Sequence, residues 1–220
     1  MKRIIIFGTG NFAKIIYLYL KSDPSFEIVA FTVNENNITE NSLFGLPIIP
    51  FEKIETIYPF QEFQMFIAIG YSNMNKKREK IFDEAKKKGY ELISYIHPST
   101  IVGHEFKMGE NCFIFENNVI QPYVELGNDV IVWTGNVLSH HTLIKNHCFI
   151  VSHVAIAGNV VVESNCFIGM NATIRNRIRI ARECVIGAGA VILENTKEKE
   201  VYVSKSTVKL DIGSDMLKDF

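Results

Sequence analysis

Aliphatic residues recur at every sixth position from Ile96 to Ile192 without one slip of register. The 17 positions of this column hold only Ile, Val, Leu or Met. A period of six is neither the period of two of an ordinary strand nor the 3.6 of a helix. Hexapeptide periodicity predicts a parallel β-helix, in which each repeat buries little alone and the stacking of coils creates the core.

A second column of small or β-branched residues follows each aliphatic by four positions. All four cysteines of the chain belong to it: Cys112, Cys148, Cys166 and Cys184. Thiols in one phase of a repeat are expected to be buried packing residues rather than a disulfide framework or a zinc site. Unpaired cysteines make a reducing, cytoplasmic compartment the expectation.

The coil is predicted to turn once every three hexads, so that residues 18 apart are neighbours in adjacent coils, about 4.8 Å apart. His140 and Gly158 have this spacing, as do Gly158 and Asn176. An ionisable imidazole is therefore expected one coil away from a glycine whose backbone N–H can be approached closely.

The first part of the chain predicts a Rossmann-like α/β domain. The aliphatic run from 2 to 7 reads as a buried strand, the segment from 8 to 13 as a glycine turn, and the segment from 14 to 20 as a helix. Further strands are predicted at 26–31 and 64–69. Strands that alternate with helices indicate a parallel sheet whose ligand crevice lies at the carboxyl ends of its strands.

The residues expected in that crevice belong to the glycine turn and to the ends of two strands. They are Gly8, Thr9, Gly10, Asn11, Phe12, Asn34, Glu35 and Gly70. A helix N-terminus after a glycine turn offers unpaired N–H groups to an anion. A dehydrogenase usually has an acidic residue at the tip of the second strand, and Asn34-Glu35 matches that pattern only loosely, which argues against NAD.

Three smaller elements complete this domain in the prediction. Residues 43–47 read as a turn, residues 52–57 as a short helix, and residues 74–88 as an amphipathic helix that Gly89 ends. A last strand is expected at 91–96. The resulting division is a Rossmann-like domain over 1–95, a β-helix over 96–195, and a C-terminal cap or tail over 196–220, because an open coil end exposes a sheet edge.

The net charge of −1 gives no electrostatic case for binding nucleic acid. No apolar run approaches the ~18 residues that a membrane helix needs. The apolar stretch at the N-terminus breaks at Gly8 and is too short for the core of a signal peptide. The composition therefore gives no indication of a nucleic-acid or membrane partner.

Several motifs stand in one order along the chain: Gly8-Thr9-Gly10, Ala68-Ile69-Gly70, the hexads, His140, and Ala157-Gly158-Asn159-Val160. In this order the chain resembles the hexapeptide sugar acyltransferases. The resemblance is closest to the sialic acid O-acetyltransferase family and its nucleotide-amino-sugar N-acetyltransferase relatives, which serve bacterial surface-glycan pathways such as lipopolysaccharide or capsule biosynthesis.

The resemblance implies a left-handed coil, a homotrimer, and acetyl-CoA in the groove between neighbouring subunits, with no metal. His140 would be the general base, and the Gly158 N–H would hold the oxyanion of the thioester. Backbone groups of Met170 and Ala188 would line the path of CoA. The N-terminal glycine turn and the tip of the second strand would hold the nucleotide of the sugar.

One departure from the family concerns the residue after the base. Relatives often carry an acidic residue there, whereas this chain has His141. The role of orienting the base must then fall to another residue or to water, and His141 is itself a candidate for a contact to the base or the substrate.

The expected reaction is direct attack of a sugar amine on acetyl-CoA in a ternary complex, with histidine taking the proton. Transfer to a sugar hydroxyl, as in the sialic acid enzymes, is the alternative, and some relatives act on free sugars. Two remoter readings are a zinc carbonic anhydrase, with ligands from His140, His141, His147 and His153, and a nucleotide-binding scaffold without activity. The acceptor sugar, the nucleotide and the acyl group stay open.

Overall fold

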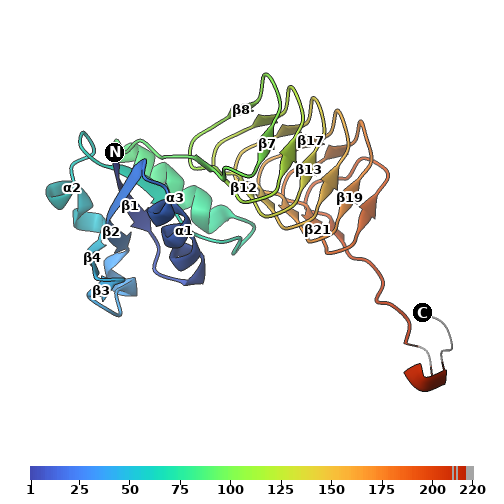
Figure 1. The fold of residues 1–220 in the computed structure, drawn as a ribbon, viewed down its shortest axis with the longest axis horizontal. Coiled ribbons are helices and arrows are strands. Elements are labelled where there is room, and N and C mark those ends of the chain that lie inside the picture. Colours follow the sequence, from blue (N-terminus) through green and yellow to red (C-terminus); the bar gives the residue numbers. More distant parts are fainter. Residues whose placement is uncertain (210, 212, 217–220) are drawn as a thin grey trace.

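The computed structural model describes residues 1–209, 211 and 213–216. An α/β domain stands at one end of a stack of β-coils, and the chain after the last coil leads away from the other end (Figure 1).

The N-terminal sheet has the strand order β3-β4-β2-β1-β5. Its strands are β1 (Lys2–Phe7), β2 (Phe26–Val33), β3 (Ser42–Leu43), β4 (Leu46–Pro50) and β5 (Gln64–Ile67). All pairs are parallel except β3 with β4, which form a hairpin. The segment predicted only as a turn thus also contributes strand residues, because positive φ angles at Phe44 and Gly45 reverse the chain there.

The predicted helices are present. They are α1 (Asn11–Ser22), α2 (Ile54–Ile57) and α3 (Lys76–Lys87), with 3₁₀ turns η1 (Glu35–Asn37), η2 (Phe51–Lys53) and η3 (Ser214–Met216). Helix α3 begins two residues later than predicted, because Asn73, Met74 and Asn75 adopt positive φ. Gly89, with φ of 92°, follows its end as expected for a C-terminal glycine.

The predicted strand over 91–96 is largely wrong. Only β6 (Tyr95–Ile96) is a strand, and it pairs with the coil rather than with the N-terminal sheet. Leu92 makes a single isolated bridge to Met65. The apolar run that suggested a strand is instead the connection that carries the chain from one domain to the next.

The coil is a prism with three parallel sheets, each named here by a central strand. The β13 face contains β7 (Ile101–Val102), β10 (Val119–Ile120), β13 (Val137–Leu138), β16 (Ala155–Ile156), β19 (Thr173–Ile174) and β22 (Val191–Ile192). The β14 face contains β8 (Lys107–Met108), β11 (Glu125–Leu126), β14 (Leu143–Ile144), β17 (Val161–Val162) and β20 (Arg179–Ile180). The β15 face contains β6, β9 (Phe113–Ile114), β12 (Ile131–Val132), β15 (Phe149–Ile150), β18 (Phe167–Ile168), β21 (Val185–Ile186) and β23 (Val201–Tyr202).

The register of these sheets confirms the period of 18. Val119 pairs with Val137, and Val137 pairs with Ala155. The last strand breaks the period, because Val201 pairs with Val185. This strand covers the edge of the final coil, as expected of a cap. The proposed C-terminal segment continues to 220, and residues 210, 212 and 217–220 lie outside the described residues.

The hexad aliphatics and the small-residue column together fill the interior of the prism. All four cysteines lie there, buried and unpaired, as predicted. Burial raises the pKa of the Cys112 thiol to about 12. These thiols are therefore packing groups, and each buried side chain of this size contributes about 1–3 kcal/mol by leaving water.

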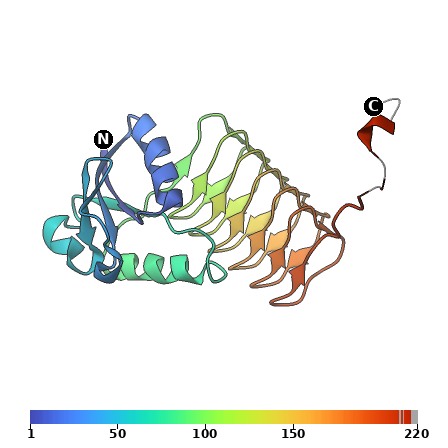
Figure 2. The same ribbon diagram turned by 90° about the horizontal axis from the view of Figure 1, so that it is seen from below.

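The N-terminal domain covers the β15 face of the coil. A buried ion pair joins Arg78 of α3 to Asp129 of the coil at 2.9 Å, and the Asn75 side chain donates to the Cys166 carbonyl at 3.1 Å. From α1, the rings of Phe12 and Tyr19 pack against aromatic residues of the same face. In Figure 2, α1 (blue) lies beside the first coils and one end of α3 (teal-green) approaches them. Among the described residues, none of the helices has the length and apolar character to span a membrane.

Candidate active site

Two edges of the prism border the β13 face, and the predicted catalytic and cofactor residues lie on them. The His140 edge, where the chain passes from the β13 to the β14 face, comprises residues 103–106, 121–124, 139–142, 157–160 and 175–178. The Met170 edge, between the β15 and β13 faces, comprises residues 133–136, 151–154, 169–172 and 187–190.

The structure brings His140 and Gly158 together as the spacing predicted. A Cβ atom added to Gly158 would lie 2.7 Å from both Cε1 and Nε2 of His140. The backbones are joined one residue further on, where the Asn159 N–H donates to the His140 carbonyl at 3.0 Å. A side chain at position 158 would therefore displace the imidazole, and the glycine lets the ring lie against the main chain.

Among the described residues, the backbone N–H groups at the second position of these four-residue corners take no part in the hydrogen bonds between coil backbones. On the third edge, the Asn128 side chain accepts from the Glu110 N–H at 2.9 Å. No hydrogen bond between described residues uses the N–H of Gly158, Met170 or Ala188. Gly158 is the predicted oxyanion donor, and Met170 and Ala188 are the residues whose backbone was predicted to line the CoA path. An unpaired N–H beside a base, as at Gly158, is suited to stabilising a developing oxyanion.

Two residues of the His140 edge that sequence analysis missed hold the histidines in place. The His140 N–H donates to Oε1 of Gln121 at 2.9 Å. His141 stacks on Tyr123, with ring centroids 4.8 Å apart. The Nδ1 atoms of His140 and His141 lie 3.1 Å apart. The 18-residue period could have pointed to Tyr123, because it lies one coil before His141.

The predicted substrate residues surround a cavity of about 330 Å³ at the carboxyl ends of the N-terminal strands. Every one of them lines it except Glu35. Gly8 has φ of 124°, and a Cβ there would lie 2.8 Å from the Ala68 carbonyl oxygen, so the turn requires glycine. Lys77 of α3 also lines the cavity and was missed, because its charge reads in the sequence as part of a solvated helix face.

Glu35 is turned away from this cavity. Its carboxylate accepts from Lys53 at 2.8 Å, while Glu52 accepts from the Asn34 side chain at 3.1 Å. Burial alone would raise the pKa of the Glu52 carboxyl, but hydrogen bonds from backbone N–H groups and from Asn34 outweigh it and lower that pKa. The tip of the second strand therefore presents an amide to the cavity, with a carboxylate behind it.

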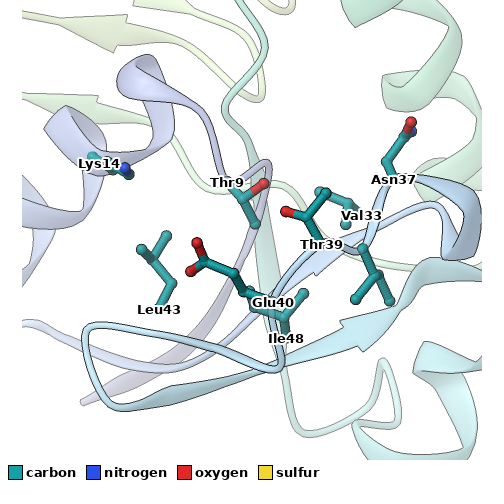
Figure 3. A pocket seen from close by; sticks show the side chains of 9 residues that line it. Thr9, Lys14, Val33, Asn37, Thr39, Glu40, Leu43 and Ile48 are labelled. Atoms are coloured by element: carbon teal, nitrogen blue, oxygen red, sulfur yellow. The ribbon is translucent and has the colours of Figure 1, made fainter.

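A smaller cavity of about 70 Å³ adjoins the first and shares Thr9, Val33 and Asn37 with it. Figure 3 shows the Thr9 and Thr39 side chains pointing toward one another across this space. Lys14 and Glu40 add one charge of each sign to its lining. The crevice is therefore polar at this end.

An aromatic groove of about 390 Å³ lies along the Met170 edge. Its lining includes Tyr71, Trp133, Phe149 and Phe167, together with the predicted cofactor residues Met170 and Ala188. Tyr71 directly follows Gly70 of the substrate cavity, and Phe12 of that cavity packs on Trp133. The substrate cavity and the aromatic groove thus meet on the Met170 side of the β13 face.

The histidines considered as zinc ligands lie on three different edges of the prism. His140 and His141 share one edge, His153 lies on the Met170 edge, and His147 lies on the third. The His147 ring is buried, with Nδ1 2.8 Å from Oδ2 of Asp129. Within the part of the chain that the structure describes, no group of three or more His, Cys, Asp or Glu side chains is placed to hold a metal ion.

Two family models match the chain. Residues 3–85 match the PglD N-terminal domain, and residues 159–194 match the bacterial transferase hexapeptide (six repeats). The chain thus carries a PglD-type N-terminal domain followed by bacterial transferase hexapeptide repeats. Its coil is a left-handed parallel β-helix, as in the solved structures that it resembles. No curated protein sequence matches the chain.

Three solved structures share the whole architecture of this chain. The acetyltransferase domain of PglB from Neisseria gonorrhoeae FA1090 is 22% identical with a TM-score of 0.81, over 91% of this chain and 96% of that one. PerB from Caulobacter crescentus, solved with CoA and GDP-perosamine, is 24% identical with a TM-score of 0.80, over 91% and 93%. WeeI from Acinetobacter baumannii AYE is 18% identical with a TM-score of 0.81, over 93% and 97%. At these identities the likeness establishes the common fold.

Proposed function

We propose that the chain transfers an acetyl group from acetyl-CoA to the amine of a nucleotide-linked amino sugar, with His140 as the general base. The observation that carries this proposal is the contact between the His140 imidazole and Gly158, whose backbone N–H is not used within the described chain. A proton acceptor and an oxyanion donor side by side are what direct acyl transfer requires.

Acetyl-CoA as the donor is supported by two solved neighbours. PglB of Neisseria gonorrhoeae was crystallised with acetyl coenzyme A, and PerB with CoA. In this chain the N–H groups of Met170 and Ala188 border an aromatic groove that would take the pantetheine arm, and Gly158 would complete the path. No residue of this mechanism forms a covalent intermediate, because the amine attacks the thioester directly.

The substrate cavity suits the phosphates of a nucleotide sugar. The first turn of α1 presents N–H groups to it, and Lys77 adds a positive charge. PerB was solved with GDP-perosamine, a nucleotide-linked amino sugar. We therefore favour an amine acceptor over a sugar hydroxyl, and the same assay with matched hydroxyl sugars separates the two.

The site has two halves on opposite edges of the β13 face: His140 with Gly158 on one edge, and the aromatic groove with the adjoining substrate cavity on the other. We propose that the two halves meet across two subunits of a homotrimer. The outward residues of this face are mostly apolar, and Ile101 and Val191 are 66% and 60% exposed. The β14 face carries ion pairs such as Lys107 with Glu125, and the N-terminal domain covers the β15 face. The apolar β13 face would pack against neighbouring copies and bring His140 of one subunit to the substrate of the next.

A cytoplasmic location and a role in surface-glycan synthesis follow from the same proposal. Acetyl-CoA and nucleotide sugars are cytoplasmic metabolites, and buried unpaired cysteines suit a reducing compartment. The proposal also divides the chain into three parts: a nucleotide-sugar domain over 1–95, an acyltransferase domain over 96–195, and a cap or tail over 196–220.

The test is a thiol-release assay with acetyl-CoA and a panel of UDP-, GDP- and dTDP-linked amino sugars. His140→Ala should lower kcat by about 10²–10⁴-fold, the usual contribution of a general base, without changing the melting temperature. His104→Ala is the matched control, because this exposed histidine lies on the same edge two coils away. A His140→Ala variant as fast as the wild type would refute the assignment of His140 as the general base. If the wild type released no thiol with any sugar of the panel, the proposed reaction itself would be refuted.

A further inference from the structure

The pair of adjacent histidines on the His140 edge has a geometry that the reaction alone does not explain. The Nδ1 atoms of His140 and His141 are 3.1 Å apart, and the rings are nearly perpendicular at 85°. The Cε1–Nε2 side of His140 faces Gly158, so Nδ1 is the atom left for His141. The two rings are thus within hydrogen-bond distance through one specific pair of atoms.

His141 is itself held from two sides. Its φ of 57° lies in the left-handed region, and its N–H donates to the Pro122 carbonyl at 3.2 Å. Its ring stacks on Tyr123 at an interplanar angle of 26°. The position of its Nδ1 is therefore set by the coil, independently of His140.

A hydrogen bond between two Nδ1 atoms requires one proton, and the two possible placements have different consequences. If His141 carries it, neutral His140 has its proton on Nε2 and cannot accept another there. If His140 carries it, Nε2 of His140 has an unprotonated lone pair facing Gly158. Only the second arrangement makes a base at the place where the substrate's proton would be released.

We propose that His141 is a positioning residue: its neutral Nδ1 accepts from Nδ1–H of His140 and so keeps the Nε2 lone pair ready to take a proton. This deepens the proposed function and rests on it for its catalytic meaning. In the step, Nε2 of His140 takes the proton that the attacking amine loses as the new C–N bond forms. The C–S bond of the thioester then breaks, and that proton passes to the departing thiolate.

No negatively charged group in the described part of the chain contacts the two imidazole rings. Neither ring makes a hydrogen bond or ion pair with a carboxylate of the described residues. The titratable side chain in contact with it is Tyr123. Other charged or titratable residues on this edge lie in further coils: His104, Glu105, Arg175 and Arg177. An imidazole acceptor orients the base without the negative charge that a carboxylate would add.

Three substitutions at position 141 separate orientation from packing. Asn presents an amide oxygen near the place of Nδ1 and should retain activity within about threefold, whereas Phe keeps the ring on Tyr123 but has no acceptor and should lose about tenfold or more in kcat. Asp supplies a charged acceptor that favours the imidazolium, so the acidic limb of kcat/KM should move to higher pH. A purely structural His141 predicts the reverse order, with Phe active and Asn impaired, and no movement of the limb, and either result would overturn the proposal.

A second measurement does not depend on turnover. Nitrogen-15 NMR of imidazole-labelled protein near neutral pH should show His140 protonated at Nδ1 in the wild type and in the Asn variant, and that preference should be lost in the Phe variant. A wild-type His140 protonated at Nε2 would refute the proposal even if the enzyme is active. The expected tautomer in a chain that acetylates nothing would instead locate the failure in the proposed reaction.

Discussion

At the scale of single residues, each edge of the prism is a series of four-residue corners, such as 139–142 and 157–160. The role of a residue in the site depends on which of the four positions it occupies. The third position of successive corners has positive φ, and His141, Asn159 and Arg177 all stand there on the His140 edge. The second position holds His140 and Gly158. The His140 N–H donates to the Gln121 side chain, whereas the Gly158 N–H has no partner among the described residues. Spacing alone therefore predicted the approach of His140 to Gly158. The Nδ1 contact with His141 could not be predicted, because it depends on side-chain rotation.

Gly158→Ala tests the importance of this contact. The backbone of Gly158 is not in the left-handed region, so alanine is tolerated, but its Cβ would lie 2.7 Å from the imidazole and push it aside. We expect kcat/KM to fall by about 10–100-fold, in line with displacement of a catalytic group, with little change in melting temperature.

The matched control for this substitution is Asn176→Ala, one coil beyond Gly158 at the same corner position and exposed. Steady-state kinetics and thermal melting of both variants give the answer. Equal activity of the Gly158 and Asn176 variants would show that the ring does not have to lie against this backbone.

At the scale of elements, α1 and α3 connect the substrate cavity to the coil. The N-terminus of α1 and Lys77 of α3 face the same cavity, while Arg78 on the next position of α3 is buried against Asp129. The charge run of α3 was interpreted from sequence as a solvated face. That interpretation fits Lys80 and fails for Arg78, because periodicity shows which side of a helix is apolar and not which charged residue finds a buried partner.

Lys77→Ala is expected to raise KM for the nucleotide sugar by about tenfold, since a lost contact to phosphate costs roughly 1.4 kcal/mol, and to leave KM for acetyl-CoA unchanged. Lys80→Ala is the control, because Lys80 lies on the same helix, is exposed, and pairs with Glu84 at 3.8 Å. Initial rates with each substrate varied in turn measure both constants. A rise in KM for acetyl-CoA alone would place the cofactor rather than the sugar in this cavity.

The elements also show where sequence reasoning stops. The hexad column located every coil strand from β6 to β22, because a repeated 18-residue period leaves no freedom of register. The irregular segment after Gly89 was misread, because its apolar residues pack between two domains and no period describes that. In the crevice the glycine turn was found, whereas the turning of Glu35 toward Lys53 depends on a contact 18 residues away that no local pattern indicates.

At the scale of the whole molecule, the three faces of the prism have different surroundings. One is covered by the N-terminal domain, one carries ion pairs, and the β13 face exposes aliphatic side chains between the two halves of the site. Exposed apolar surface bordered by functional residues is typical of an interface. A closed ring of three such copies would complete three sites at once.

Val137→Arg should dissociate the trimer and abolish turnover, because it places a charge in the middle of the β13 face, where Val137 is 39% exposed. Val161→Arg makes the same change on the β14 face and should leave both properties intact. Sedimentation equilibrium and the thiol-release assay report on the two outcomes. A wild-type monomer with full activity would rule out the shared site.

The most direct test of the account is subunit complementation between two inactive chains. One is His140→Ala, and the other is Gly70→Trp, which fills the substrate cavity at a glycine with open space around its Cβ position. Mixed trimers, isolated by a different tag on each chain, contain one site that combines an intact His140 with an intact cavity. We predict that they regain about a third of the wild-type rate per trimer, the share expected for one site in a three-fold ring. Mixed trimers as inactive as their parents would contradict the claim that His140 of one subunit acts on the sugar held by another.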